Sequence, residues 1–418
     1  MVRISPVRRA LVPVNSDAAE RISAPNYDEF QSDREIWDML QARPDNLLRV
    51  TMPHCHVAAV NEIGVDGSPE SLRHGYDQMQ ALEDSPLTRE VNDLLWVYEI
   101  TSPKRPMEPQ LGLGGCGHTS QIRTEHNPGG EIIRNEGIHP EKAAGRARLL
   151  EAIHCDTGFV NLAVRDAHSA LLGGLQEVAR SRNCDFAADD EGGNRHRIWL
   201  VTDPAEKSIL TSILEQEPAA YVADGNHRSA AAASLGFEHF LAVFFPVSRM
   251  GLEPYNRLLK VGEIDAAELL RRLEPDFQIE RRGPMPGFRP GRVHEVGLYA
   301  GGDWYVLTVR PGVMDAASAV RSIDADFLQR QVIEGIFGIA DARDKRITYV
   351  GGNKDAAWLK TEVDSGRYSL ALSLAPVTMD QFIAVCEQNQ FMPPKSTWFD
   401  PKIRTGLVMS LLDPQKPD

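Results

Sequence analysis

The residues of this chain best suited to chemistry lie close together in Ala219–Leu235, which reads AAYVADGNHRSAAAASL. Asp224 offers a carboxylate for a metal ion or a hydroxyl group, His227 a donor that switches with pH, and Arg228 the planar fork of donors that suits phosphate. These types at this spacing predict an anion site. The alternative is an ordinary turn in which Asn226 caps a helix and the two cations face water.

The elements that must position these residues follow from the same segment. The β-forming residues up to Val222 predict a strand, Gly225 breaks it, the alanines after Ser229 favour a helix, and Gly236 supplies a stop. The first N–H groups of a helix that begins near Asn226 have no intrahelical partners and carry the positive end of its dipole. A strand, a turn and a helix are therefore expected to present an anion site such as one for phosphate.

A second carboxylate, Glu136, follows an apolar strand end at Ile132-Ile133 and precedes a helix that carries Arg146 and Arg148. Such junctions between elements often carry functional side chains. The residues alone favour a surface salt bridge from Glu136 to one of the two arginines, and the alternative is a catalytic carboxylate.

The third candidate is the C-terminal stretch FMPPKSTWFDPKIRTGLVMSLL, in which prolines predict an irregular segment before a last strand. It carries Lys395, Ser396, Thr397 and Lys402, and two lysines beside hydroxyl groups invite an anion. The alternative is that these lysines face water.

Two weaker patterns accompany these candidates. His54 and His56 follow the predicted buried strand Leu47–Pro53, where alternate residues share a face and could share a metal, but no second ligand cluster with metal spacing follows. The glycine-rich Leu111–Gly117 lacks the flanking strand and helix of a dinucleotide-binding loop, and a flexible hairpin is expected there.

Composition bounds the class of protein. The 418 residues, 42% hydrophobic and 25% charged, are typical of a soluble globular chain with two or three domains, and the net charge of −14 disfavours nucleic acid and anionic lipid as partners. Five scattered cysteines indicate a reducing cytosol. We expect a cytoplasmic protein without a signal peptide or a membrane span, because the most apolar run, Phe240–Val247, is far shorter than the roughly 20 residues that a span needs.

Alternation of strands and helices predicts an α/β arrangement around the candidate site. The strands Ile198–Pro204 and Phe240–Val247 bracket the segment that holds Asp224, which places this residue at the carboxyl end of a strand, where open α/β sheets keep ligands. After Lys260 the pattern changes to a helix at Ala266–Leu273 and a hairpin around Gly-Gly-Asp, so we place a boundary there. No phosphate loop, protein-kinase motif set or GxSxG elbow is present.

Five segments resemble, in the same order and over nearly the full chain, the bacterial family called domain of unknown function 1015. They are Ala24–Phe30 (APNYDEF), Asn135–Leu150, Ala223–Arg228 (ADGNHR), Gly251–Leu259 (GLEPYNRLL) and Met392–Val408, the longest match. This family is similar in fold to the ParB/sulfiredoxin group and the free serine kinases. The resemblance implies a mixed α/β (α+β) fold, with a ParB/sulfiredoxin-like nucleotide- and substrate-binding region at 1–260 and a C-terminal α/β region at 261–418 that contributes the KST-x-F-x-PK segment to the site.

The resemblance also implies a kinase, a transferase that uses Mg²⁺ and ATP or ADP to phosphorylate a free amino acid, most simply L-serine to O-phosphoserine. Glu136 would accept the hydroxyl proton, Asp224 would hold Mg²⁺, and Asp28 in the first matching loop is a rival base, with Glu29 beside it. The implied nucleotide and phosphate contacts are Gly225, Asn226, His227, Arg228, Arg257, Lys395, Ser396, Thr397 and Lys402, and the implied substrate contacts are Tyr27, Asn135 and Arg146. The partners would be a nucleotide and a small amino-acid-like substrate, and a homo-oligomer is left open.

The chain departs from the family pattern at several positions. Asn135, Asn226 and Asn256 stand where the family usually has histidine, and Gly145 replaces an acid. Asparagine keeps a donor and an acceptor but cannot carry a proton or a positive charge. Three alternatives therefore stay open, namely a different hydroxylated substrate, catalysis by other groups, or a nucleotide-binding regulatory or scaffold protein without transferase activity.

Overall fold

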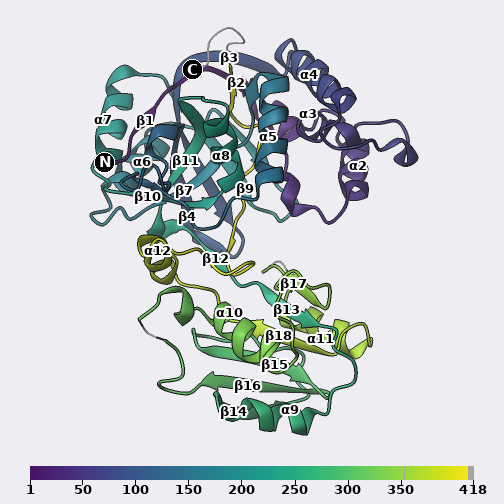
Figure 1. Ribbon diagram of the computed structural model, residues 1–418. Helices are drawn as coiled ribbons and strands as arrows, with labels where there is room; N and C mark the ends of the chain where they lie inside the picture. Colours follow the sequence, from purple (N-terminus) through teal and green to yellow (C-terminus); the bar gives the residue numbers. More distant parts are fainter. Residues whose placement is uncertain (316, 353, 413–418) are drawn as a thin grey trace. The chain divides into compact units, whose positions relative to one another are not determined.

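The computed structural model describes residues 1–315, 317–352 and 354–412, apart from the side chain of residue 28. The chain forms two compact units, one of Met1–Met250 with Pro401–Asp418 and the other of Gly251–Asp400 (Figure 1). The division expected at residue 260 therefore differs from the observed one. The boundary falls earlier, and the last segment joins the first unit because β20 (Met409–Leu411) pairs with β2 (Val7–Pro13).

A mixed sheet of twelve strands is the framework of the first unit. Its order is β5-β10-β7-β11-β4-β3-β2-β20-β6, with β1, β8 and β9 attached beside it. The remaining strands are β1 (Ile4–Ser5), β3 (Thr88–Ser102), β4 (Arg105–His118), β5 (Ile132–Ile133), β6 (Cys155–Asp156), β7 (Val160–Val164), β8 (Phe186–Asp189), β9 (Arg195–Val201), β10 (Ala220–Asp224) and β11 (His239–Pro246). Strand β7 is parallel to β11 and antiparallel to β10, so the sheet is mixed, and the predicted α/β class is confirmed.

Strand β4 corrects one expectation, because the glycine-rich Leu111–Gly117 lies inside this long strand and is not a hairpin. The glycines leave room for side chains from the neighbouring strands. A Cβ atom on Gly114 would lie 1.9 Å from the ring of Trp96, and one on Gly112 would lie 2.7 Å from Phe245. The glycines thus serve close packing within the sheet.

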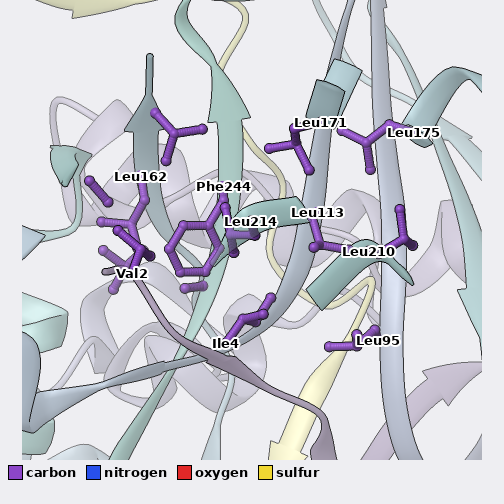
Figure 2. Packing of buried hydrophobic residues seen from close by; sticks show 14 of the residues in the cluster. Val2, Ile4, Leu95, Leu113, Leu162, Leu171, Leu175, Leu210, Leu214 and Phe244 are labelled. Carbon is purple, nitrogen blue, oxygen red and sulfur yellow. The ribbon is translucent and has the colours of Figure 1, made fainter. Parts of the chain in front are cut away.

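Helices and short 3-10 turns cover this sheet. They are α1 (Ser16–Ile22), η1 (Tyr27–Glu29), α2 (Asp33–Ala42), α3 (Leu48–Thr51), η2 (Pro53–Cys55), η3 (Val60–Glu62), α4 (Pro69–Glu83), η4 (Thr119–Gln121), α5 (Pro140–Ile153), α6 (Ala170–Ser181), α7 (Pro204–Leu214), α8 (Asn226–Ser234) and η5 (Val247–Arg249). Figure 2 shows the core in which Leu171 of α6 and Leu214 of α7 pack with Phe244 of β11. A second core joins α2, α3, α4 and α5 through residues such as Ile36 and Ile153.

The segment Leu47–Pro53 corrects a second expectation, because it forms α3 and the start of η2 in place of a strand. Its apolar residues Leu47, Leu48 and Val50 are all buried. A short fully buried helix and a buried strand give the same apolar run, so periodicity does not separate them. The side chain of Asn46 stabilises the start of this helix, because its Oδ1 accepts the N–H of Leu48 at 3.0 Å.

The second unit is an antiparallel sheet in the order β14-β16-β15-β18-β13-β17, with a separate pair of β12 and β19. Its elements are β12 (Leu252–Glu253), β13 (Asn256–Leu259), α9 (Ala266–Leu273), β14 (Phe277–Gly283), β15 (Glu295–Ala300), β16 (Asp303–Val309), η6 (Val320–Ser322), α10 (Asp324–Phe327), the π-helix η7 (Leu328–Glu334), β17 (Ile347–Val350), α11 (Ala356–Asp364), β18 (Leu370–Leu374), α12 (Met379–Glu387) and β19 (Trp398–Phe399). The predicted hairpin is confirmed as β15 and β16, joined at Gly301 and Gly302, both with positive φ. Within the described ranges, no helix combines the length and the apolar character that crossing a membrane requires.

Candidate functional site

The strand, turn and helix predicted in Ala219–Leu235 are present as β10 and α8. Gly225 joins them at φ +97°, and a Cβ atom there would lie 3.0 Å from the guanidinium of Arg228 and 3.1 Å from Cα of Val160. Glycine is favoured in this left-handed conformation. The alternative in which Asn226 caps the helix does not hold, because Gly225 has the cap position and Asn226 is the first helical residue.

Asp224, the last residue of β10, lies in a buried ion pair. Nζ of Lys402 donates to its Oδ2 at 2.9 Å, and Nη2 of Arg228 lies 3.7 Å from its Oδ1. Burial alone would raise the pKa of this carboxyl, but the two cations outweigh burial and hold its pKa well below the usual range. Asp224 is therefore ionised, and it ties the start of α8 to the segment after Pro401.

Arg228, in the first turn of α8, has more hydrogen-bond donors than the described residues use. Its Nη1 donates to Oδ1 of Asn26 at 2.8 Å, and Nδ2 of Asn26 in turn donates to the carbonyl of Ile403 at 3.0 Å. Within the described residues its Nε and Nη2 are buried and have no hydrogen-bond partner. Buried polar groups are nearly always satisfied, so two such donors at a helix N-terminus fit an acceptor such as a phosphate oxygen.

The side chain of Asn226 connects α8 to the loop that precedes α5. Its Nδ2 donates to Oδ1 of Asn135 at 2.6 Å and lies 3.3 Å from Oε1 of Glu136, while its own Oδ1 is buried without a partner among the described residues. The next residue, His227, accepts the backbone N–H of His139 at Nε2 (3.1 Å). The carboxylate of Glu136 thus lies beside the first residue of α8.

A cavity of about 570 Å³, open solvent included, lies in the first unit, and Arg228 is part of its wall. Its lining includes Asn26, Tyr27, Arg146, Asp156, Thr157 and Arg228. The guanidinium of Arg146 lies 3.7 Å from the ring centroid of Tyr27, which is a cation–π contact on the wall of the cavity.

Sequence reasoning missed Asn26, Asp156 and Thr157 in this wall. Asp156 is buried, which raises its pKa to about 6 even though the N–H groups of Leu241 and Gly158 and the charge of Arg228 favour the ionised form. The signal that could have found the last two is the run Asp-Thr-Gly, which Phe159 separates from the start of β7.

The second unit holds the other predicted phosphate contacts. Buried Arg257 donates from Nη2 to the carbonyl of Lys395 at 3.1 Å, and burial lowers its pKa to about 10. Nζ of Lys395 lies 5.2 Å from the ring centroid of Tyr255, and Oγ of Ser396 donates to the carbonyl of Pro393 at 2.7 Å. Oδ1 of Asn256, one of the family departures, accepts the N–H of Leu374. The roles of Arg257, Lys395, Ser396 and Thr397 stay predictions.

The two rival bases differ in what the structure describes. The side chain of Asp28 lies outside the described residues. Oε1 of Glu29 accepts the backbone N–H of Asn26 at 2.8 Å and so stabilises the turn η1. Glu136 therefore remains the candidate whose surroundings at α8 are defined.

The fold and this site define a mixed α/β protein with polar and charged groups gathered at a helix N-terminus. The chain belongs to the family described as protein of unknown function (DUF1015), whose model matches residues 4–326. No curated protein matches the chain.

Among solved structures, the chain is similar to a free serine kinase in complex with AMP, at 11% identity over 64% of this chain and 83% of that chain, with a TM-score of 0.32. It is also similar to SbnI with a C-terminal truncation from Staphylococcus aureus, at 10% identity over 69% and 82%, with a TM-score of 0.37. A conserved hypothetical protein from Pyrococcus furiosus is 11% identical over 65% and 89%, with a TM-score of 0.31. Likeness at this level does not assign a function.

Proposed function

We propose that this protein is a phosphotransferase that moves a phosphoryl group from ATP or ADP to the hydroxyl of a small amino-acid-like molecule, most simply L-serine, in a ParB/sulfiredoxin-like core. The observation that carries the proposal is Arg228, whose Nε and Nη2 are buried in the first turn of α8 without a hydrogen-bond partner among the described residues, although Nη2 lies 3.7 Å from Oδ1 of Asp224. The first N–H groups of α8 and these two donors are the groups that would bind a phosphate. Gly225 lets the backbone approach closely there.

Asp224 is the proposed ligand of the Mg²⁺ ion that this reaction would use. Oδ1 of Asp224 and the unpartnered Oδ1 of Asn226 are hard oxygen ligands of the kind that Mg²⁺ takes together with phosphate oxygens. When bound, Mg²⁺ would supply charge neutralisation at the phosphates. Lys402 keeps Asp224 ionised and adds a positive charge on the same side.

The remaining task is to bind the acceptor and take its proton. Glu136 is the proposed base, since a carboxylate within hydrogen-bond reach of the hydroxyl suffices. Nδ2 of Asn226 at 3.3 Å would hold its side chain in place. The cavity beside Tyr27 and Arg146 would take the acceptor, and Asn135 would contact it near Glu136.

Incubation with Mg²⁺, ATP or ADP and a panel of amino acids, followed by mass spectrometry, tests the transferase assignment. We expect O-phosphoserine in the serine sample. Nucleotide binding with no phosphorylated product from any acceptor would contradict it. That result would favour the second candidate, a nucleotide-binding regulatory protein, which is supported by asparagine at position 226, where a proton-carrying side chain is absent.

Replacing Arg228 tests the phosphate cradle separately. The Arg228→Met variant loses charge-assisted hydrogen bonds worth about 1.5–3 kcal/mol each, so nucleotide affinity should fall by at least about tenfold. Isothermal titration measures it. Arg180→Met, on α6, is the control and should bind as the wild type does. Equal affinity in both variants would remove Arg228 from the phosphate site.

A further inference from the structure

A cluster of metal-ligating side chains lies in the first unit where α2 begins beside η2. Asp33 is the first residue of α2, and His54 and Cys55 belong to η2. A carboxylate oxygen of Asp33, a ring nitrogen of His54 and the sulfur of Cys55 all lie within 4.8 Å of one another. This arrangement follows from the local fold, since a strand over Leu47–Pro53 would have placed His54 and Cys55 on opposite faces.

The ring of His54 is buried beside two carboxylates and makes no hydrogen bond of ordinary length to either. Its side chain is 1% exposed, and its Nδ1 has no hydrogen-bond partner among the described residues. Nε2 lies 3.6 Å from Oδ1 of Asp33, and Nδ1 lies 3.5 Å from Oδ1 of Asp66. Both distances exceed those of ordinary hydrogen bonds. Two ligands bound about 2.1 Å from one tetrahedral ion would lie about 3.4 Å apart, close to the spacing of Asp33 and His54.

The thiol of Cys55 lies in the same acidic surroundings. The side chain is fully buried, and its sulfur lies within 4.8 Å of a ligand atom of Asp33 and of one of His54. Two carboxylates and a histidine around a buried thiol provide mixed oxygen, nitrogen and sulfur donors, a set that Zn²⁺ accepts. A dication would offset the negative charge that these groups bring together.

We propose that Asp33, His54 and Cys55 bind one Zn²⁺ ion, and that Asp66 orients the His54 ring from its other nitrogen. A carboxylate behind a ligating histidine is the usual arrangement around zinc. Binding breaks the S–H bond of Cys55, forms a zinc–sulfur bond and releases the proton to solvent. The fourth position opens to water because Asp33 is 55% exposed. The ion would bind the start of α2 to η2, and Asp66 would connect the loop before α4 to the same site through His54.

A nearby histidine pair provides a matched control. Nδ1 of His56 lies 2.9 Å from Nε2 of His74, and the two rings stack with centroids 5.1 Å apart. These two rings already satisfy each other by a hydrogen bond. The proposal therefore predicts that His74→Gln leaves zinc binding unchanged.

The test uses the full chain, stripped with a chelator and titrated with Zn²⁺ against a chromogenic competitor. We expect one ion per chain, with affinity lowered by at least about tenfold in Asp33→Asn and unchanged in His74→Gln and in the surface control Asp38→Asn. The wild-type Co²⁺ complex should show thiolate-to-cobalt charge-transfer absorption, and Cys55→Ser should lack it. If Cys55→Ser does not fold, Asp33→Asn and the wild-type cobalt spectrum still decide.

Four results would overturn the proposal. They are a wild-type chain that binds no Zn²⁺, equal zinc affinity in a folded Asp33→Asn variant, a wild-type cobalt complex without thiolate absorption, and loss of binding in His74→Gln while Asp33→Asn binds normally. Circular dichroism of each variant separates loss of the site from loss of the fold. None of these results depends on transferase activity.

Discussion

At the scale of single residues, the charge of Asp224 holds the two cations that the proposed reaction would use. It pairs with Lys402 and Arg228, and the side chains of all three are less than one fifth exposed. Breaking a buried pair leaves an uncompensated charge, which costs about 3–5 kcal/mol, even though the intact pair contributes little net stability. The carboxylate of Asp224 fixes the positions of both cations at the start of α8.

The Asp224→Asn substitution should make the folded protein less stable by about 3 kcal/mol at pH 7, because Lys402 and Arg228 lose their counter-charge. The pKa of Asp224 is lowered by folding, so its contribution to stability is present above the pKa of about 3.9 in the unfolded chain and is lost as pH falls toward the folded pKa. Urea unfolding at pH 7 and pH 3 should therefore show a difference between variant and wild type that shrinks in acid.

The exposed pair of Arg34 and Asp38 supplies the control for this measurement. Asp38→Asn should change stability by less than about 1 kcal/mol at either pH. A gap between Asp224→Asn and wild type that is equally large at pH 3 would show that the ion pair is not its cause.

At the scale of elements, the sequence predicted the helices, strands and turns that depend on residues close together in the chain. The strand, turn and helix around Gly225, the hairpin at Gly301-Gly302 and the helix Ala266–Leu273 are confirmed, because turn glycines and helix periodicity act over a few residues. The prediction of a strand at Leu47–Pro53 is wrong, because an apolar run indicates that a segment is buried but does not distinguish a helix from a strand. The glycines of β4 were assigned wrongly because Trp96 and Phe245, which require them, lie on other strands.

Gly225→Ala tests the turn between β10 and α8. An alanine at this position would have to keep φ at +97°, and its Cβ would approach Arg228 and Val160 closely. We therefore expect the folded protein to lose about 1–2 kcal/mol of stability and to bind nucleotide more weakly. Gly236→Ala is a matched control, because φ there is +78° with no atom within 4 Å of a Cβ. Both substitutions place a side chain at positive φ, so scanning calorimetry should show a loss of stability in both variants. Titration calorimetry should show lower nucleotide affinity in Gly225→Ala only. Equal nucleotide affinities in the two variants would contradict a close approach of the ligand to this turn.

At the scale of the whole molecule, the chain leaves the first unit after Met250 and returns at Pro401. The returning segment brings Lys402 to Asp224 and adds β20 beside β2. It also brings Arg404, whose backbone N–H donates to Oη of Tyr98 at 3.0 Å and whose Nη1 donates to Glu191 at 2.6 Å. The sequence could not predict this return, or the placing of Asp156 in the cavity wall, because both depend on pairing between distant segments.

Truncation after Asp400 should therefore destabilise the first unit by at least about 4 kcal/mol, since several buried hydrogen bonds and an ion pair are lost together. Lys402→Met, which removes the ion pair alone, should have a smaller effect. Urea unfolding followed by tryptophan fluorescence compares the two, because Trp96 and Trp199 are buried in the first unit. An unchanged midpoint in the truncated chain would contradict the structural role of the segment.

The most direct test of a phosphotransferase site at α8 compares the wild type with Glu136→Gln in the same preparation. Gln keeps the size of the side chain but cannot accept the hydroxyl proton, and general-base catalysis is worth about 10²–10⁴-fold in rate. We predict that O-phosphoserine formation falls at least about 100-fold while the Kd for nucleotide stays within about threefold. Wild-type turnover in Glu136→Gln would contradict the assignment of Glu136 as the base.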